Sequence, residues 1–98
     1  MQFDVVLAPE AARRLRRFTA RDRAWVKEAL ERHLRYEPRK VSKSRIKRLR
    51  GLSQPQYRLR VGEIRVFYDV TEGTVEVLAI VTKEQAQSWL DDEGTPTS

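Results

Sequence analysis

The chain has 98 residues, no cysteine, and 20 Lys and Arg against 14 Asp and Glu, which gives a net charge of +6. This length predicts one domain with a modest core built on a single sheet. The lack of cysteine excludes disulfide bonds and thiolate metal sites, and no apolar run is long enough for a secretion signal or a membrane span. We therefore expect a cytoplasmic protein that needs no metal and no cofactor.

The charge is unevenly distributed along the chain. Residues 1–50 hold 16 Lys and Arg against 6 Asp and Glu, whereas residues 51–98 hold 4 against 8. A basic surface of this kind attracts polyanions. The first half of the chain is therefore expected to present its cations to phosphate groups.

The first elements are predicted to be one strand and two helices. Residues 2–7 alternate, with the odd positions apolar, which is typical of a strand. Pro9 suits the first position of a helix, and the apolar spacing predicts a short helix over residues 9–18. Residues 19–22 resemble a capping box, and a second helix is expected to follow to about residue 36. The side chains predicted to form its buried stripe are Trp25, Val26, Ala29, Leu30, His33 and Leu34.

Basic residues dominate both the first helix and the connector that follows the second helix. The helix arginines, among them Arg13 and Arg17, form either a solvated face or a binding site for an acidic protein segment. For the connector, residues 38–50, two interpretations stay open: it tracks phosphate groups of a nucleic acid, or it is a solvated linker. Its candidate RNA-binding residues are Lys43, Arg45, Lys47, Arg48 and Arg50.

Residues 56–70 predict a β-hairpin. Apolar and polar residues alternate on both sides of the pair Gly62–Glu63, and a glycine in the first position of a two-residue loop is what a type II′ turn requires. This register places Arg60 opposite Arg65 and Arg58 opposite Phe67. One face then holds only apolar side chains, with Tyr57 and Tyr68 among them.

The opposite face of this hairpin carries three arginines, Arg58, Arg60 and Arg65. Like charges directly opposite each other destabilise a sheet by up to about 1 kcal/mol. A polyanion that binds there is the explanation we favour.

A second tight turn at residues 71–74 and a strand to residue 81 complete the predicted sheet. Uninterrupted alternation would put Leu78 and Ile80 beside Phe67, as an apolar strip on the arginine-bearing face. Residues 83–90 are expected to form a short helix that returns Trp89 to the sheet, and residues 91–98 a disordered polar tail.

The predicted order, β-α-α-β-β-β, is an α+β fold with a helical hairpin on one face of a small antiparallel sheet, in a single domain over residues 1–90. This order, with the stretches LRGL, YRLRVGEIRVFYDV and VEVLAIV running into TKEQAQSW, resembles the RelE/ParE family of bacterial toxin–antitoxin toxins. The resemblance covers about residues 3–89. It implies mRNA cleavage in the ribosomal decoding site for a RelE-like member, and inhibition of DNA gyrase for a ParE-like member.

The resemblance also implies site residues. The two strand cations of the RelE pattern fall on Arg58 and Arg60, and the arginine of the next strand falls on Arg65. Lys83 and Trp89 stand where the best-known pattern has arginine and tyrosine. A tryptophan supplies no proton of useful acidity, so Lys83 is the candidate acid or base, while Trp89 and Phe67 are candidates for stacking on an RNA base.

A cognate antitoxin is the partner that the resemblance implies. The residues expected to contact it are Phe67, Leu78, Ile80, Arg13 and Arg17. Three functions therefore stay open: a ribosome-associated mRNA endonuclease, a gyrase inhibitor, or a member that binds RNA and antitoxin without turnover.

Overall fold

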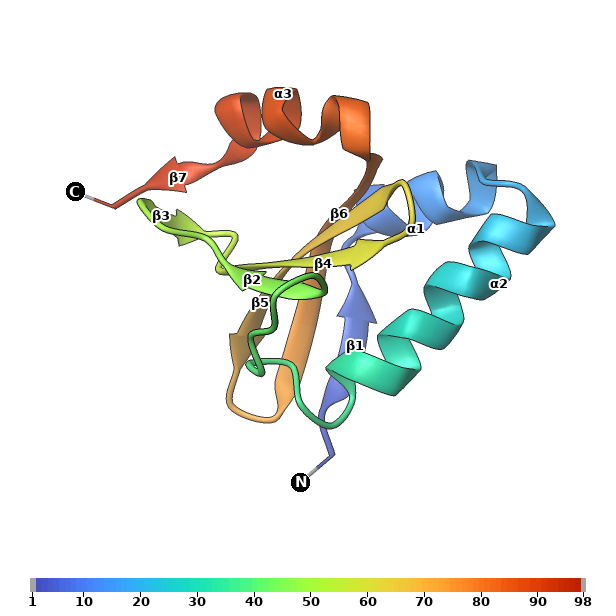
Figure 1. The fold of residues 1–98 in the computed structure, drawn as a ribbon, viewed down its shortest axis with the longest axis horizontal. Helices are drawn as coiled ribbons and strands as arrows, with labels where there is room; N and C mark the ends of the chain where they lie inside the picture. The colour runs from blue at the N-terminus through green and yellow to red at the C-terminus, as the bar shows by residue number, and fades with distance from the viewer. Residues whose placement is uncertain (1, 98) are drawn as a thin grey trace.

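The computed structural model describes residues 2–97, which form one five-stranded sheet with helices on both faces (Figure 1). The sheet has the order β1-β6-β5-β4-β2; β1 runs parallel to β6, and the other neighbours are antiparallel. The elements are β1 (Asp4–Leu7), α1 (Pro9–Arg17), α2 (Ala20–Ala29), the π-helical turn η1 (Leu30–Leu34), β2 (Ile46–Arg48), β3 (Leu52–Gln54), β4 (Tyr57–Val61), β5 (Ile64–Thr71), β6 (Thr74–Thr82), α3 (Lys83–Glu93) and β7 (Thr95–Pro96). The α+β prediction is confirmed.

The two helices predicted after the first strand are present. Pro9 occupies the start of α1, and the Thr19 hydroxyl caps α2 by accepting a hydrogen bond of 3.2 Å from the Asp22 amide. The second helix continues as η1 to Leu34. The connector is not wholly irregular, since β2 pairs with β4 and forms the outer edge of the sheet.

The central hairpin has the predicted register. Val61 pairs with Ile64, Arg60 with Arg65 and Arg58 with Phe67. Gly62 has φ of +58°, and no other residue type in the described part of the chain has positive φ. Positive φ at the first turn residue alone is the type II′ geometry, which matches the right-handed twist of the flanking strands.

The register of the next hairpin differs from the prediction. Tyr68 pairs with Val77, but Phe67 pairs with Ala79, so Leu78 is an extra residue in β6. This β-bulge inverts the alternation beyond it and turns Ile80 toward the core. The prediction that Ile80 lies beside Phe67 on the arginine-bearing face is therefore wrong, because it assumed an uninterrupted ladder.

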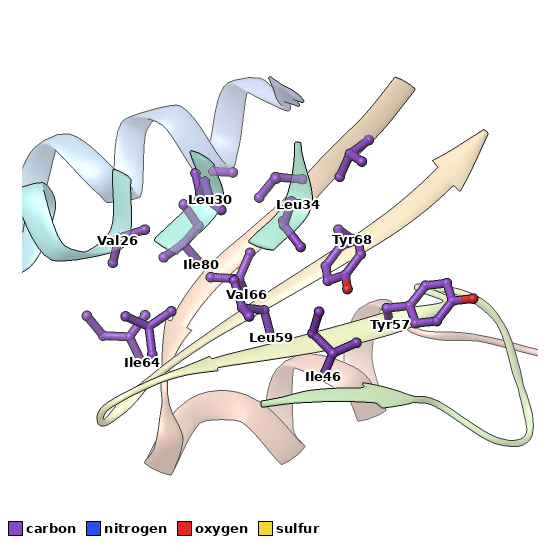
Figure 2. Packing of buried hydrophobic residues seen from close by; sticks show 14 of the residues in the cluster. Val26, Leu30, Leu34, Ile46, Tyr57, Leu59, Ile64, Val66, Tyr68 and Ile80 are labelled. Carbon is purple, nitrogen blue, oxygen red and sulfur yellow. The ribbon is translucent and has the colours of Figure 1, made fainter. Parts of the chain in front are cut away.

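The main core lies between the sheet and the layer formed by α1, α2 and η1. Figure 2 shows Val26, Leu30 and Leu34 pointing from the helices toward the strands, where they are buried. Tyr57 and Tyr68 belong to this core as predicted, with ring centroids 5.4 Å apart. Trp25 does not: it is 47% exposed, and the prediction that it is buried is wrong.

A smaller apolar cluster lies on the opposite face, under α3. Phe67, Ala79 and Val81 are buried there, and Trp89 and Leu90 of α3 cover them. A complete capping box between Thr82 and Gln85 fixes the start of α3. The helix is therefore positioned over one half of this sheet face and leaves the other half to the arginines.

The C-terminal segment differs from the disordered tail expected from residue 91 onward. The helix α3 continues to Glu93, and β7 pairs with β3 in a second, two-stranded sheet. Ser98 lies outside the described residues. None of the helices described is long and apolar enough to cross a membrane.

Candidate nucleic-acid interface

Four basic side chains occupy the half of the sheet that α3 leaves free. Lys47 of β2 pairs with Arg58 of β4, and Arg60 of β4 pairs with Arg65 of β5, so all four lie on one face. We call Lys47, Arg58, Arg60 and Arg65 the cationic face. The strand register, which the II′ turn sets, is what brings these residues together.

Arg58 lies in the middle of the cationic face and is partly buried. Its Nε atom is inaccessible to solvent and makes no hydrogen bond within residues 2–97. Burial, and then the charges of Arg65 and Arg60, lower the pKa of Arg58 from its ordinary value, although an arginine stays protonated at neutral pH. A buried donor without an acceptor is costly, so folding stability does not explain the position of Arg58.

Arg65 differs from its neighbours because it is buried and internally bonded. Its Nη1 atom donates hydrogen bonds of 2.8 and 3.1 Å to the carbonyl oxygens of Gly62 and Ile64. Arg60 across the strand is exposed. No ion pair joins Arg58, Arg60 or Arg65 to a carboxylate within the described part of the chain; the ion pairs there join Arg32 with Glu28, Arg35 with Glu31 and Lys40 with Glu37.

Lys83 and Trp89, the remaining residues of the pattern, come from α3. Lys83 is its first residue, and its backbone amide donates a 2.7 Å hydrogen bond to the carbonyl of Glu63 in the hairpin turn. Arg65 also binds this turn, through Gly62, so the turn positions both residues. Trp89 stacks on Phe67 at 5.1 Å between centroids. Phe67 is fully buried beneath it and is not available to an RNA base, which corrects that expectation.

The basic residues of the connector do not form one continuous surface. Lys47 belongs to the cationic face, whereas the Arg48 guanidinium lies 5.1 Å from the centre of the Tyr57 ring. Arg45 is directed toward the helices, where its Nη1 lies 2.7 Å from Nε2 of His33. Lys43 and Arg50 are exposed.

The apolar strip expected to contact a partner does not lie on the surface. Phe67 is covered by α3, Ile80 is in the main core because of the bulge, and only Leu78 is partly exposed. Arg13 and Arg17 of α1 are exposed and line a hollow of about 320 Å³ between α1, β6 and Trp89. The basic part of this candidate contact is thus accessible in the described chain, while its apolar part is mostly covered.

Two features of the helical side were missed from the sequence. Trp25 lies against Gly62 so closely that a side-chain carbon at Gly62 would be 2.4 Å from the indole ring. His33 is half-buried, and burial, followed by the charges of Arg45 and Arg32, lowers its pKa. The positive-φ glycine was visible in the sequence as a turn signal, but its contact with a residue 37 positions earlier was not.

The cationic face is chemically suited to a phosphodiester. Guanidinium groups donate paired hydrogen bonds to phosphate oxygens and stay charged at every physiological pH. No group of three or more His, Cys, Asp or Glu that could hold a metal ion occurs within residues 2–97.

Solved structures of known proteins share this architecture. The chain superposes on the toxin–antitoxin complex RelBE2 of Mycobacterium tuberculosis with a TM-score of 0.63 and 26% sequence identity, over 84% of this chain and 99% of that one. The chain therefore has the fold of the RelE toxins. The free Escherichia coli toxin RelE, solved as a double mutant, gives a TM-score of 0.69 at 21% identity, over 91% of this chain and 92% of that one.

A third RelE structure, the RelE–RelB complex of Pyrococcus horikoshii, covers 85% of this chain and 97% of its own at 22% identity, with a TM-score of 0.64. No protein-family model matches the chain. No curated protein matches it in sequence either. The likeness to RelE toxins therefore lies in the fold, at low sequence identity.

Proposed function

We propose that this chain is the RelE-family toxin of a type II toxin–antitoxin module and a metal-independent, ribosome-associated mRNA endonuclease that acts in the cytoplasm. The observation that supports the proposal is the lack of carboxylate partners on the cationic face. Three arginines lie together there without a carboxylate partner in the described chain, and one of them has a buried, unbonded Nε atom. An RNA phosphate would accept hydrogen bonds from the accessible nitrogens of Arg58 and Arg60.

In the proposed reaction the 2′-oxygen of one nucleotide attacks the adjacent phosphorus, the bond to the 5′-oxygen breaks, and a 2′,3′-cyclic phosphate and a 5′-hydroxyl form. Arg58 and Arg60 bind the non-bridging oxygens, where negative charge increases in the transition state. Arg65, held by the turn carbonyls, adds positive charge beside Arg60. Electrostatic stabilisation of this kind is usually the largest contribution to catalysis.

Lys83 is proposed to protonate the departing 5′-oxygen, while solvent takes the proton from the 2′-hydroxyl. It is exposed at the start of α3, beside the turn that also holds Arg65. Trp89 stands where the family pattern has tyrosine and has no hydroxyl to donate. Its role in this proposal is to stack on Phe67 and to hold α3 in place. This combination predicts a slow nuclease. Replacing Trp89 by Tyr should raise the cleavage rate, because it adds a hydroxyl group that can transfer a proton.

A cognate antitoxin is the proposed partner, supported by the two RelB-bound structures that share the fold. We place an acidic antitoxin segment in the hollow lined by Arg13 and Arg17, with Leu78 as an apolar contact nearby. Opposite charges across an interface speed association and favour the correct partner.

The test compares Arg58→Gln with Arg21→Gln, which removes an equal charge from an exposed position of α2. Each protein is added to a translating ribosome mixture, and new 5′ ends of the mRNA are mapped. The proposal expects cuts with the wild type and Arg21→Gln, and at least 10²-fold slower cutting with Arg58→Gln. Intact mRNA with the wild type, together with altered plasmid supercoiling in a gyrase assay, would instead identify a gyrase inhibitor.

A further inference from the structure

The hollow between α2, η1 and the β4–β5 turn adjoins the cationic face and shares Arg60 with it. It has a volume of about 360 Å³, within the range of small-ligand sites. The side chains that define it are Trp25, Glu28, Arg32, His33, Ser44 and Arg45, with Arg60 at its rim. We call it the helix-side hollow.

The aromatic wall of the helix-side hollow is Trp25, which both packs against the turn and is exposed. Trp25 remains 47% exposed although it packs against Gly62. The glycine at this turn leaves room for the indole ring, so the ring is held in place and still presents surface to solvent. A held aromatic ring beside cations is the usual platform for a nucleobase.

The charged groups of the hollow leave an excess of positive charge. Arg32 lies 3.8 Å from Glu28, which is the carboxylate in the lining, so these two groups compensate each other. Arg45 donates to His33, whose Nε2 must therefore accept and whose ring is neutral. Arg45 keeps its full charge and its remaining donors, and Arg60 adds a second unpaired cation.

Arg60 also connects the hollow with the cationic face. It belongs to that face by strand register, and it lines the hollow at the end of β4. The backbone holds the two parts in a fixed relation, since the Arg60 amide donates a 2.8 Å hydrogen bond to the Arg45 carbonyl. A strand of RNA on the cationic face would reach the hollow by passing the end of β4.

We propose that the helix-side hollow binds one nucleotide of single-stranded RNA next to the cleavage position, with its base on Trp25 and its phosphate between Arg45 and Arg60. This inference depends on the proposed function, because it extends the same RNA track past the end of β4. An acidic protein segment could bind the two cations, but the large aromatic ring beside them would add little to its affinity.

The test follows the indole N–H signals in NMR spectra of the full chain during titration with a uridine hexanucleotide. The chain has two tryptophans, and Trp25→Phe assigns their signals. We expect the Trp25 signal to shift, and Trp25→Ala to weaken binding about 10- to 100-fold. Arg45→Gln should weaken binding and reduce the salt slope by about 0.7, whereas Lys27→Gln, an exposed change of equal charge on α2, should do neither. Thermal unfolding of each variant checks that it is folded.

Three outcomes would overturn the inference. If Trp25→Ala and Arg45→Gln bind the hexanucleotide like the wild type while Arg58→Gln does not, the cationic face binds RNA and the hollow does not. If a glutamate hexapeptide shifts the Trp25 signal and RNA leaves it unchanged, the hollow binds an acidic protein segment. If neither ligand binds any variant or the wild type, the proposed function fails together with the inference.

Discussion

Trp89 of α3 lies parallel to Phe67 of β5, with ring planes 7° apart and centroids separated by 5.1 Å. This stack closes the apolar half of a sheet face whose other half is cationic. Trp89→Ala should therefore expose Phe67 and release α3, at a cost of about 1–3 kcal/mol in the free energy of unfolding. Urea unfolding measures the loss, and Ser88→Ala, one residue earlier on an exposed position, is the control. An equal effect of both variants would show that the stack does not hold the helix.

Arg65→Ala should affect both stability and cleavage. Considered from the strand register alone, removal of one of two opposed arginines is neutral or slightly stabilising. The structure adds two hydrogen bonds from Arg65 to turn carbonyls, and their loss should cost about 1–3 kcal/mol. Cleavage by the folded fraction should fall roughly 10²–10³-fold, and Arg65→Lys should lie between wild type and alanine in both measurements. An Arg65→Ala protein as stable as the wild type would contradict the structural role.

Tyr68→Phe tests a buried hydrogen bond. The Tyr68 hydroxyl donates to the carbonyl of Pro38 at 2.7 Å and so ties the connector to the core; burial raises the pKa of this tyrosine. Its removal leaves a buried carbonyl unpaired and should cost about 1–3 kcal/mol. Tyr57→Phe is the matched control, since that hydroxyl lies at the edge of the same cluster (Figure 2). Chemical denaturation of both variants should show a clearly larger loss for Tyr68→Phe.

His33 should make stability depend on pH. Its pKa is lowered in the folded state from an ordinary value of 6.5, first by burial and then by Arg45 and Arg32. The unfolded chain therefore binds a proton at higher pH than the folded chain does. The free energy of unfolding should fall as pH decreases from about 7.5 through 6.5 toward the folded pKa, and should level off below it.

In His33→Gln the side-chain oxygen can still accept a hydrogen bond from Arg45, but the side chain does not titrate. Its stability should be flat over the pH range in which the wild type weakens, when both are measured by thermal unfolding at constant ionic strength. If the wild type and His33→Gln lose stability in parallel as the pH falls, groups other than His33 cause the pH dependence.

RNA binding should be strongly salt-dependent. Four cations on the cationic face predict a slope near −3 when the logarithm of the binding constant is plotted against that of the salt concentration. Fluorescence anisotropy of a labelled single-stranded RNA at several salt concentrations gives this slope. A slope near zero would exclude a polyanion from this face.

The local pattern of this chain was sufficient for most of its fold. Alternation around Gly62 gave the hairpin register and hence the grouping of Arg58, Arg60 and Arg65, because a two-residue turn leaves no freedom in the pairing. The burial of Val26 and Leu34 followed from helical spacing. Residues close together in the sequence determine these features, so one sequence is enough to predict them.

The errors arose where distant segments decide the outcome. Helical spacing placed Trp25 inside, but the contact with Gly62 holds it at the surface. The polar residues after 91 gave no periodic signal, yet β7 pairs with β3, and Thr97 donates a 3.0 Å hydrogen bond to Gly51. Arg58 has an unbonded Nε atom, whereas Arg65 is bonded to turn carbonyls. This difference also depends on contacts that sequence spacing does not predict.

The extra residue in β6 means that this strand has one more residue than its ladder with β5 has pairs. Removal of Leu78 would leave Tyr68 opposite Val77 and Phe67 opposite Ala79, with Ile80 still directed to the core. A single-residue deletion in a central strand ordinarily moves every later side chain to the wrong face. Here the chain should accept a shortening at this one position, at the expense of the local bend that the bulge provides. Related sequences that differ in length within this strand can therefore keep the same core.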